Sequence, residues 1–217
     1  MPTSEDILVG LGTIANDGVL FAAAWHFALL LVLVAVARGW RPSRRTAATA
    51  LSLPLASVAA FAWAYGNPFN GLVFAALALA LAALARRLDR EPVTRGASWA
   101  VVAGALMVAF GWVYPHFVQV DSAAAYLYAA PTGLIPCPTL SVVIGLALLA
   151  GLSDRAWSTL TAAAGLLYGL FGTFRLGVTL DAALLAGALA LLVPAWRPHL
   201  RLPAHPTGGV RHHKQTN

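Results

Sequence analysis

The residues best suited to chemistry in this 217-residue chain lie around a Pro-Cys-Pro sequence, Pro136-Cys137-Pro138. Each proline lacks a backbone N–H and disfavours helix at the residue before it. A regular helix can therefore start at Pro138 and run to about Leu152, which is short for a bilayer core of about 30 Å. We expect the Pro-Cys-Pro segment to be unwound below the outer surface, where its backbone must contact protein or a watery cavity. The alternative is a plain proline entry to a short helix, with Cys137 as a small buried residue.

Five further polar side chains interrupt or end apolar runs of the sequence. His26 lies deep inside such a run, so it is either a functional group or a neutral histidine bonded to a backbone carbonyl. Tyr114 and His116 end another run, where a snorkelling interfacial pair is the simpler explanation. Arg175 and Asp181 flank the start of the last run, and we expect Arg175, the lone outside arginine, to form a structural ion pair with an acid.

All these residues fall in the half of the membrane that we expect to face outward, although they come from different apolar runs. They are predicted to line one outward-facing polar pocket, whereas the cytoplasmic half offers no comparable set. The candidate pocket residues are His26, Tyr114, His116, Pro136, Cys137, Pro138, Arg175 and Asp181.

Metal binding is a weaker prediction for part of this set. His26, His116 and Cys137 offer nitrogen and sulfur ligands for copper or zinc, although no paired spacing supports such a site. We expect no other cofactor, and the single cysteine excludes an internal disulfide. P-loop, His-Glu-x-x-His and Gly-x-Ser-x-Gly motifs are absent, so no catalytic residue is predicted and an enzyme is not favoured.

The composition indicates that these residues are embedded in a membrane. Hydrophobic residues make up 59% of the chain and charged residues only 10%, whereas a soluble domain carries about 25% charged residues. A soluble enzyme or binding domain is therefore excluded. The net charge of +6 comes from short basic clusters between apolar runs, which is typical of the cytoplasmic side of a membrane protein. We expect a lipid bilayer as partner and no nucleic acid.

The apolar runs predict an all-α, polytopic transmembrane bundle of about seven spans. With seven spans, every Lys and Arg except Arg175 falls on one side, which puts the N-terminus outside and the C-terminus in the cytoplasm. Residues 121–135 are expected to stay outside or to be re-entrant. The predicted spans are Gly18 to Ala37, Thr46 to Tyr65, Phe69 to Ala85, Ala97 to Val118, Leu134 to Leu152, Ala156 to Phe174 and Gly177 to Trp196.

The spans predict one transmembrane domain over residues 1–196, followed by a basic, disordered cytoplasmic tail over residues 197–217. Pro54 is expected to kink the second span. Gly165 and Gly169 lie four residues apart on one face of the sixth span, which favours close helix packing.

The second half of the chain resembles a known family. The stretch APTGLIPCPTLSVVIGLALL, followed by LLYGLFGTFRLGVTLDAALLAGALALL, is similar to a bacterial family of small multi-pass membrane proteins of unknown function. The resemblance covers about residues 114–193, and the Pro-Cys-Pro-Thr motif is its most specific feature. It implies an inner-membrane location and a helical bundle, and it implies no established substrate.

Three functions are compatible with these patterns. The leading hypothesis is a transporter-like protein or sensor that binds or conducts a small solute or ion through the outer pocket. The second is a metal-handling or redox membrane protein that uses His26, His116 and Cys137. The third is a non-catalytic assembly subunit, with a homo-oligomer or a larger membrane complex as its partner.

Overall fold

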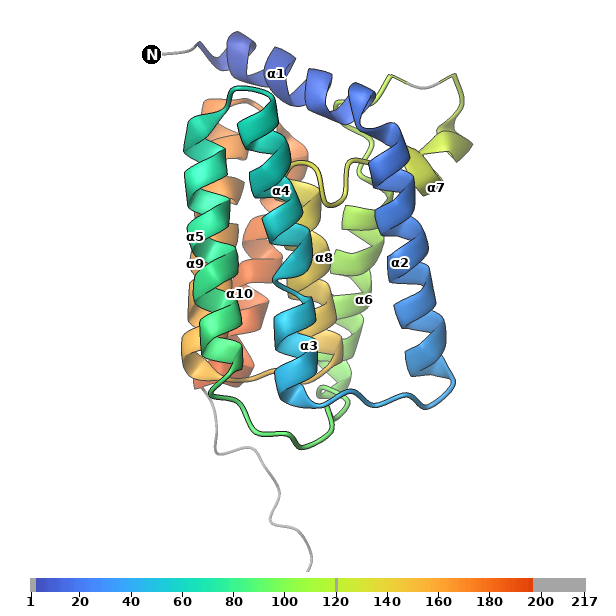
Figure 1. The fold of residues 1–217 in the computed structure, drawn as a ribbon, viewed down its shortest axis with the longest axis vertical. Helices are drawn as coiled ribbons and strands as arrows, with labels where there is room; N and C mark the ends of the chain where they lie inside the picture. The colour runs from blue at the N-terminus through green and yellow to red at the C-terminus, as the bar shows by residue number, and fades with distance from the viewer. Residues whose placement is uncertain (1–2, 120, 197–217) are drawn as a thin grey trace, which may run out of the picture.

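A computed structural model describes residues 3–119 and 121–196, and helices are the only regular elements in that part of the chain (Figure 1). The prediction of an all-α fold is therefore confirmed. The long helices run side by side along one axis, and one N-terminal helix crosses the end of the bundle. The tail predicted to be disordered, residues 197–217, lies outside the described residues.

Ten α-helices and three shorter turns make up the described residues. Short 3-10 turns, Ala123–Ala125 and Thr179–Asp181, precede α7 and α10, and a π-helical turn, Phe171–Arg175, continues α9. The α-helices are α1 (Ser4–Asp17), α2 (Val19–Ala37), α3 (Arg44–Ala50), α4 (Leu53–Ala64), α5 (Pro68–Ala85), α6 (Ser98–Val113), α7 (Tyr126–Ala129), α8 (Pro136–Leu149), α9 (Arg155–Leu170) and α10 (Ala182–Trp196).

Four helical segments of the described residues are long and apolar enough to cross a membrane, which is fewer than the seven predicted spans. The apolar helices α6 and α8 are shorter, with 16 and 14 residues. α6 ends at Val113 instead of Val118, because Pro115 disfavours helix at the residue before it. The four segments are Val19–Ala37, Arg44–Ala64, Pro68–Ala85 and Thr179–Trp196.

The second of these segments is interrupted at Leu51 and Ser52, between α3 and α4. Pro54 follows in the first turn of α4 and has no N–H for the carbonyl of Ala50. The break of two residues thus ends just before the first turn that holds Pro54, and a kink there stays a prediction.

α1 was not among the helices predicted from the sequence. Its first turn is fixed by a capping box, in which the Thr3 hydroxyl accepts from the N–H of Asp6 and the Asp6 carboxylate accepts from the N–H of Thr3. Leu11, Ile14 and Ala15 are buried at the spacing of one helix face, whereas the rest of α1 is exposed or half-buried. α1 is thus an amphipathic helix that covers one end of the bundle (Figure 1).

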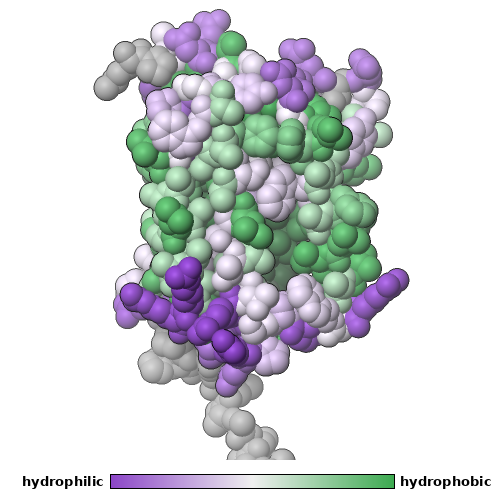
Figure 2. Space-filling model, viewed as in Figure 1, coloured by the Kyte–Doolittle hydropathy of each residue, from purple (hydrophilic) through white to green (hydrophobic). Residues whose placement is uncertain are grey.

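The opposite end is formed by two basic loops, residues 38–43 and 86–97, which we call the arginine-rich end. Backbone bonds join the loops: Val93 N–H donates to the Pro42 carbonyl at 2.8 Å, and Arg44 N–H donates to the Glu91 carbonyl at 2.8 Å. The Arg44 guanidinium also lies 3.2 Å from the Asp89 carboxylate. Hydrophilic side chains gather at this end, below a mostly apolar middle (Figure 2).

The centre of the bundle is α8, which packs most extensively against α6. A Cβ on Gly104 of α6 would lie 2.6 Å from the carbonyl of Gly145 on α8, and a Cβ on Gly145 would lie equally close to the carbonyl of Gly104. Glycine at both positions therefore lets the two backbones approach without side chains between them. In α9, Gly165 and Gly169 make room for side chains of neighbouring helices, Ile144 of α8 and Leu185 of α10, as the helix-packing interpretation of these glycines predicts.

Candidate functional site

Three polar side chains from distant parts of the sequence meet at the end of the bundle near α1. Asp181, which is 2% exposed, lies just before α10 and accepts two hydrogen bonds. The Tyr114 hydroxyl donates to Asp181 Oδ1 at 2.6 Å, and the Cys137 thiol donates to Asp181 Oδ2 at 3.1 Å. We call Asp181, Tyr114 and Cys137 the Asp181 cluster.

The local structure explains how each member reaches the cluster. Tyr114 ends α6 because Pro115 follows it, and Cys137 lies in the first turn of α8. The π-helical turn after α9 packs Gly172 against the carboxyl group, where a Cβ would lie 1.8 Å from Asp181 Oδ2. Only glycine fits at this distance, and π-helical turns are frequent at functional sites. Gly172 was not among the predicted pocket residues. The only feature of the sequence that points to it is its place in the glycine-rich sixth apolar run.

The Pro-Cys-Pro segment is helical, so the predicted unwinding of these residues is wrong. α8 begins at Pro136, two residues before the predicted start, and ends at Leu149. The first turn of a helix tolerates proline, because its N–H groups have no intrahelical partner to lose. The unwound segment is the preceding one, residues 130–135, which is entirely buried.

This buried loop satisfies its polar groups within the protein. The Thr132 hydroxyl donates to the Gly111 carbonyl at 2.7 Å, and Gly133 N–H donates to the Thr139 hydroxyl at 2.8 Å. Gly133 has a φ of +80°, and its Cα hydrogen faces Trp25, so a larger residue would fit neither the backbone nor the space. The loop is therefore a fixed support for the start of α8.

His26 has two backbone partners outside the Asp181 cluster. Its Nδ1 lies 2.8 Å from the Ala22 carbonyl oxygen, and its Nε2 lies 2.8 Å from the Trp112 carbonyl oxygen. A neutral imidazole carries one N–H, so one of these contacts is a hydrogen bond at a time. This arrangement matches the alternative of a carbonyl-bonded histidine that joins two helices.

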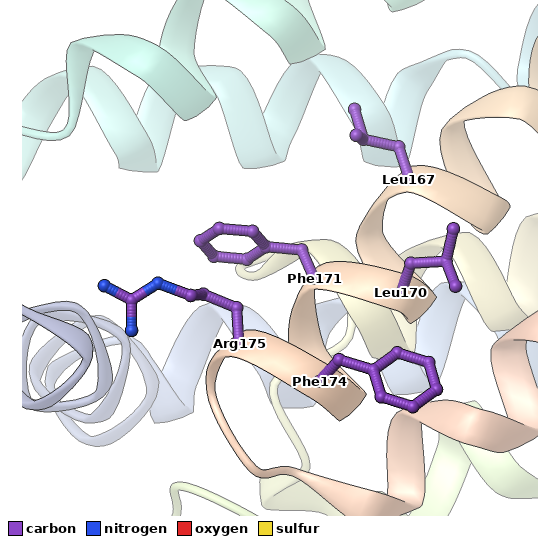
Figure 3. Close-up of a pocket in the computed structure, with 5 residues that line it drawn as sticks. All are labelled: Leu167, Leu170, Phe171, Phe174 and Arg175. Carbon is purple, nitrogen blue, oxygen red and sulfur yellow. The ribbon is translucent and has the colours of Figure 1, made fainter.

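Arg175 makes no ion pair with an acid among the described residues, so the predicted ion pair is wrong. The π-helical turn directs the Arg175 side chain toward α1, where its guanidinium donates to the Ser4 hydroxyl (Figure 3). The Ser4 hydroxyl in turn donates to the Arg175 carbonyl at 3.1 Å. Among residues 3–119 and 121–196, the only ion pair joins Arg44 and Asp89.

His116 lies at the edge of the cluster. Its ring is 4.2 Å from the Phe117 ring and 6.5 Å from the Tyr114 ring, measured between centroids. The structure thus gathers three of the predicted pocket residues, Tyr114, Cys137 and Asp181, around one carboxyl group, with the His116 ring beside that of Tyr114.

A shallow, open depression of about 440 Å³ lies on the outside of the π-helical turn (Figure 3). Arg175 is the only predicted pocket residue among those that line it. A single cavity lined by all eight residues stays a prediction. The lining residues are Leu167, Leu170, Phe171, Phe174 and Arg175.

Within the described residues, no three His, Cys, Asp or Glu side chains come together in a group that could hold a metal ion. The trio predicted for copper or zinc, His26, His116 and Cys137, is not such a group. Binding of either metal stays a prediction, and the four histidines of residues 197–217 lie outside the described residues.

The chain matches no protein-family model, and comparison with curated proteins and with solved structures finds no significant match. The resemblance of residues 114–193 to an uncharacterised bacterial membrane family stays a prediction.

The Tyr114–Asp181 bond is testable against a matched exposed pair. Tyr114→Phe leaves a buried carboxyl oxygen without its donor, so we expect a loss of about 1–3 kcal/mol in stability and a lower melting temperature in detergent. Tyr65→Phe is the control, because its hydroxyl donates to the exposed Asp17 at 3.4 Å, and we expect no measurable change. Equal melting temperatures for the two variants would contradict the buried cluster.

Proposed function

We propose that the chain is an integral protein of the bacterial inner membrane that crosses the bilayer seven times, with its N-terminus outside. Four long apolar segments support this topology, together with α6, α8 and α9, which pack among them. α6 and α8 are short, with lengths of about 24 and 21 Å at 1.5 Å per residue. The buried loop before α8 adds part of the length that α8 lacks for a full crossing of the bilayer. The arginines of the two joined loops at the arginine-rich end support the orientation.

We further propose that the Asp181 cluster binds a proton or a small cation, as part of a transporter-like protein or a sensor. The observation that carries this proposal is a carboxyl group that is 2% exposed, has only two neutral donors, and makes no ion pair with any described residue. An ionised carboxylate in apolar surroundings costs several kcal/mol unless a positive charge compensates it. A proton on the carboxyl group, or a cation beside it, supplies that charge.

The neighbours of the carboxyl group favour a small, positively charged ligand. The Tyr114 hydroxyl donates one proton and still has lone pairs that can face a cation. Asp181 Oδ2 and the Gly172 backbone leave no room for a large solute on that side.

Ligand-dependent stability tests the proposed site. Purified protein is melted in detergent while pH, Na⁺, K⁺ and Li⁺ are varied one at a time. We expect acidification or one of the cations to stabilise the wild type, by about 2.7 kcal/mol at a concentration 100 times the dissociation constant. Asp181→Asn should lose the stabilisation by the effective cation, and its stability should gain less on acidification than that of the wild type, because its amide needs no positive partner.

Asp17→Asn is the matched control for this experiment, because Asp17 also pairs with a tyrosine but is exposed. It should respond as the wild type does. A wild-type response that survives in full in Asp181→Asn, or is lost equally in Asp17→Asn, would overturn the proposed site.

Labelling of single cysteines in intact cells tests the topology. In a Cys137→Ala background, Thr3→Cys and Arg90→Cys place one exposed thiol at each end of the bundle. A membrane-impermeant maleimide should label Thr3→Cys in intact cells and label Arg90→Cys only after lysis. Labelling of both positions from outside would contradict the odd number of crossings, three, proposed between residues 3 and 90.

A further inference from the structure

The half of α2 nearer the arginine-rich end is not packed against the bundle. The three buried residues of α2 are Ala22, His26 and Leu29, whereas every residue from Leu30 to Ala37 is exposed or half-buried. Side-chain bonds join α2 to the bundle in the first half only, through His26 and through Trp25, whose Nε1–H donates to the Ser57 hydroxyl at 3.0 Å. α2 is thus fixed near α1 and stands apart toward the arginine-rich end.

An apolar groove of about 410 Å³ lies between this half of α2 and the bundle. Leu33 of α2 forms one wall, Leu149 of α8 lies at one end, and residues between 105 and 113 of α6 form the opposite wall. Apart from the indole N–H of Trp112, which donates to the Leu127 carbonyl, the lining side chains have no polar group. A water molecule finds no hydrogen-bond partner in such a groove, whereas a hydrocarbon chain fills it without losing any hydrogen bond.

Two unpaired arginines lie at the end of the groove. Arg38 follows Leu33 by five residues, which is about 7.5 Å along a helix axis. Arg95 is adjacent to Gly96, whose N–H donates to the Leu149 carbonyl at 3.2 Å. Arg38 and Arg95 are exposed, and neither makes an ion pair within residues 3–119 and 121–196.

We propose that this groove binds an anionic phospholipid, with one acyl chain between α2 and α6 and the phosphate group between Arg38 and Arg95. The order of the two parts fits a lipid, because the apolar surface lies at the level of the membrane helices and the positive charge lies at their end. A partner helix fits less well. Helices associate in membranes through small residues spaced four apart, whereas residues 30–37 of α2 are mainly Leu and Val and contain no such pair.

Competition between two lipids tests the proposal. Delipidated protein in mild detergent is mixed with equal amounts of phosphatidylglycerol and phosphatidylcholine of the same chain length. Bound lipid is then counted by native mass spectrometry. We expect the wild type to retain one phosphatidylglycerol with a preference on the order of tenfold, because each arginine near the headgroup favours the anionic lipid. Equal retention of both lipids by the wild type would overturn the proposal.

Two pairs of substitutions separate a site from general charge attraction. Arg38→Gln with Arg95→Gln should abolish the preference. Arg86→Gln with Arg87→Gln removes the same charge from exposed positions after α5 and should keep the preference. An equal loss in both double variants would show nonspecific attraction to the arginine-rich end and contradict the proposed site.

Ala109→Trp fills the groove while it leaves both arginines in place, because Ala109 is an exposed lining residue of α6. We expect this variant to melt at the wild-type temperature before lipid is added and to lose the retained phosphatidylglycerol. Unchanged lipid retention would place the lipid elsewhere. A wild-type dimer that Ala109→Trp converts to monomer would assign the groove to a second copy of the chain.

Discussion

The structure depends on one constraint, which is that polar groups inside an apolar bundle must find their partners within the protein. The buried loop before α8 satisfies it through Thr132 and Thr139, which replace the helical bonds that residues 130–135 lack. The imidazole N–H of His26 satisfies it by donating to a backbone carbonyl, either that of Ala22 in α2 or that of Trp112 in α6. Asp181 satisfies it only in part, because two neutral donors satisfy its hydrogen bonds but do not balance a negative charge. This incomplete balance is the reason to regard Asp181 as a functional group.

The buried loop before α8 and the residues around Asp181 also hold the membrane helices in position. The loop fixes the start of α8, the central helix, and α8 in turn brings Cys137 to the carboxyl group. The π-helical turn packs Gly172 against the Asp181 carboxyl group and directs the Arg175 side chain toward Ser4 of α1. The end of the bundle under α1 is therefore assembled around one carboxylate, whereas the arginine-rich end is assembled around paired loops and an open groove.

Much of the fold could be predicted from the sequence, because long apolar runs bounded by arginines leave few alternatives to membrane helices. The predicted bounds of the first and third spans differ from α2 and α5 by one residue at most. The break before Pro54 was predictable from the missing N–H of proline. α1 was missed because its apolar run, residues 7–12, is too short to cross a bilayer and lies next to the acidic residues Glu5 and Asp6.

The site was less predictable, because its contacts join residues far apart in the chain. The sequence analysis selected Tyr114, Cys137 and Asp181 for their depth, and nothing in their spacing shows that two of them bond the third. The Arg175–Ser4 contact spans 171 positions, so an acid was the natural but wrong partner to predict. The start of α8 was misjudged because the constraint before proline disfavours helix without forbidding it in a first turn.

Infrared difference spectroscopy of the Asp181 carboxyl group tests the central claim most directly. Spectra of membrane-reconstituted protein are recorded while pH or the stabilising cation is changed. The account predicts carboxyl bands that change in the wild type and are absent from the difference spectrum of Asp181→Asn. Identical carboxyl bands in the two spectra would mean that the responding group lies elsewhere, and would contradict a binding site at Asp181.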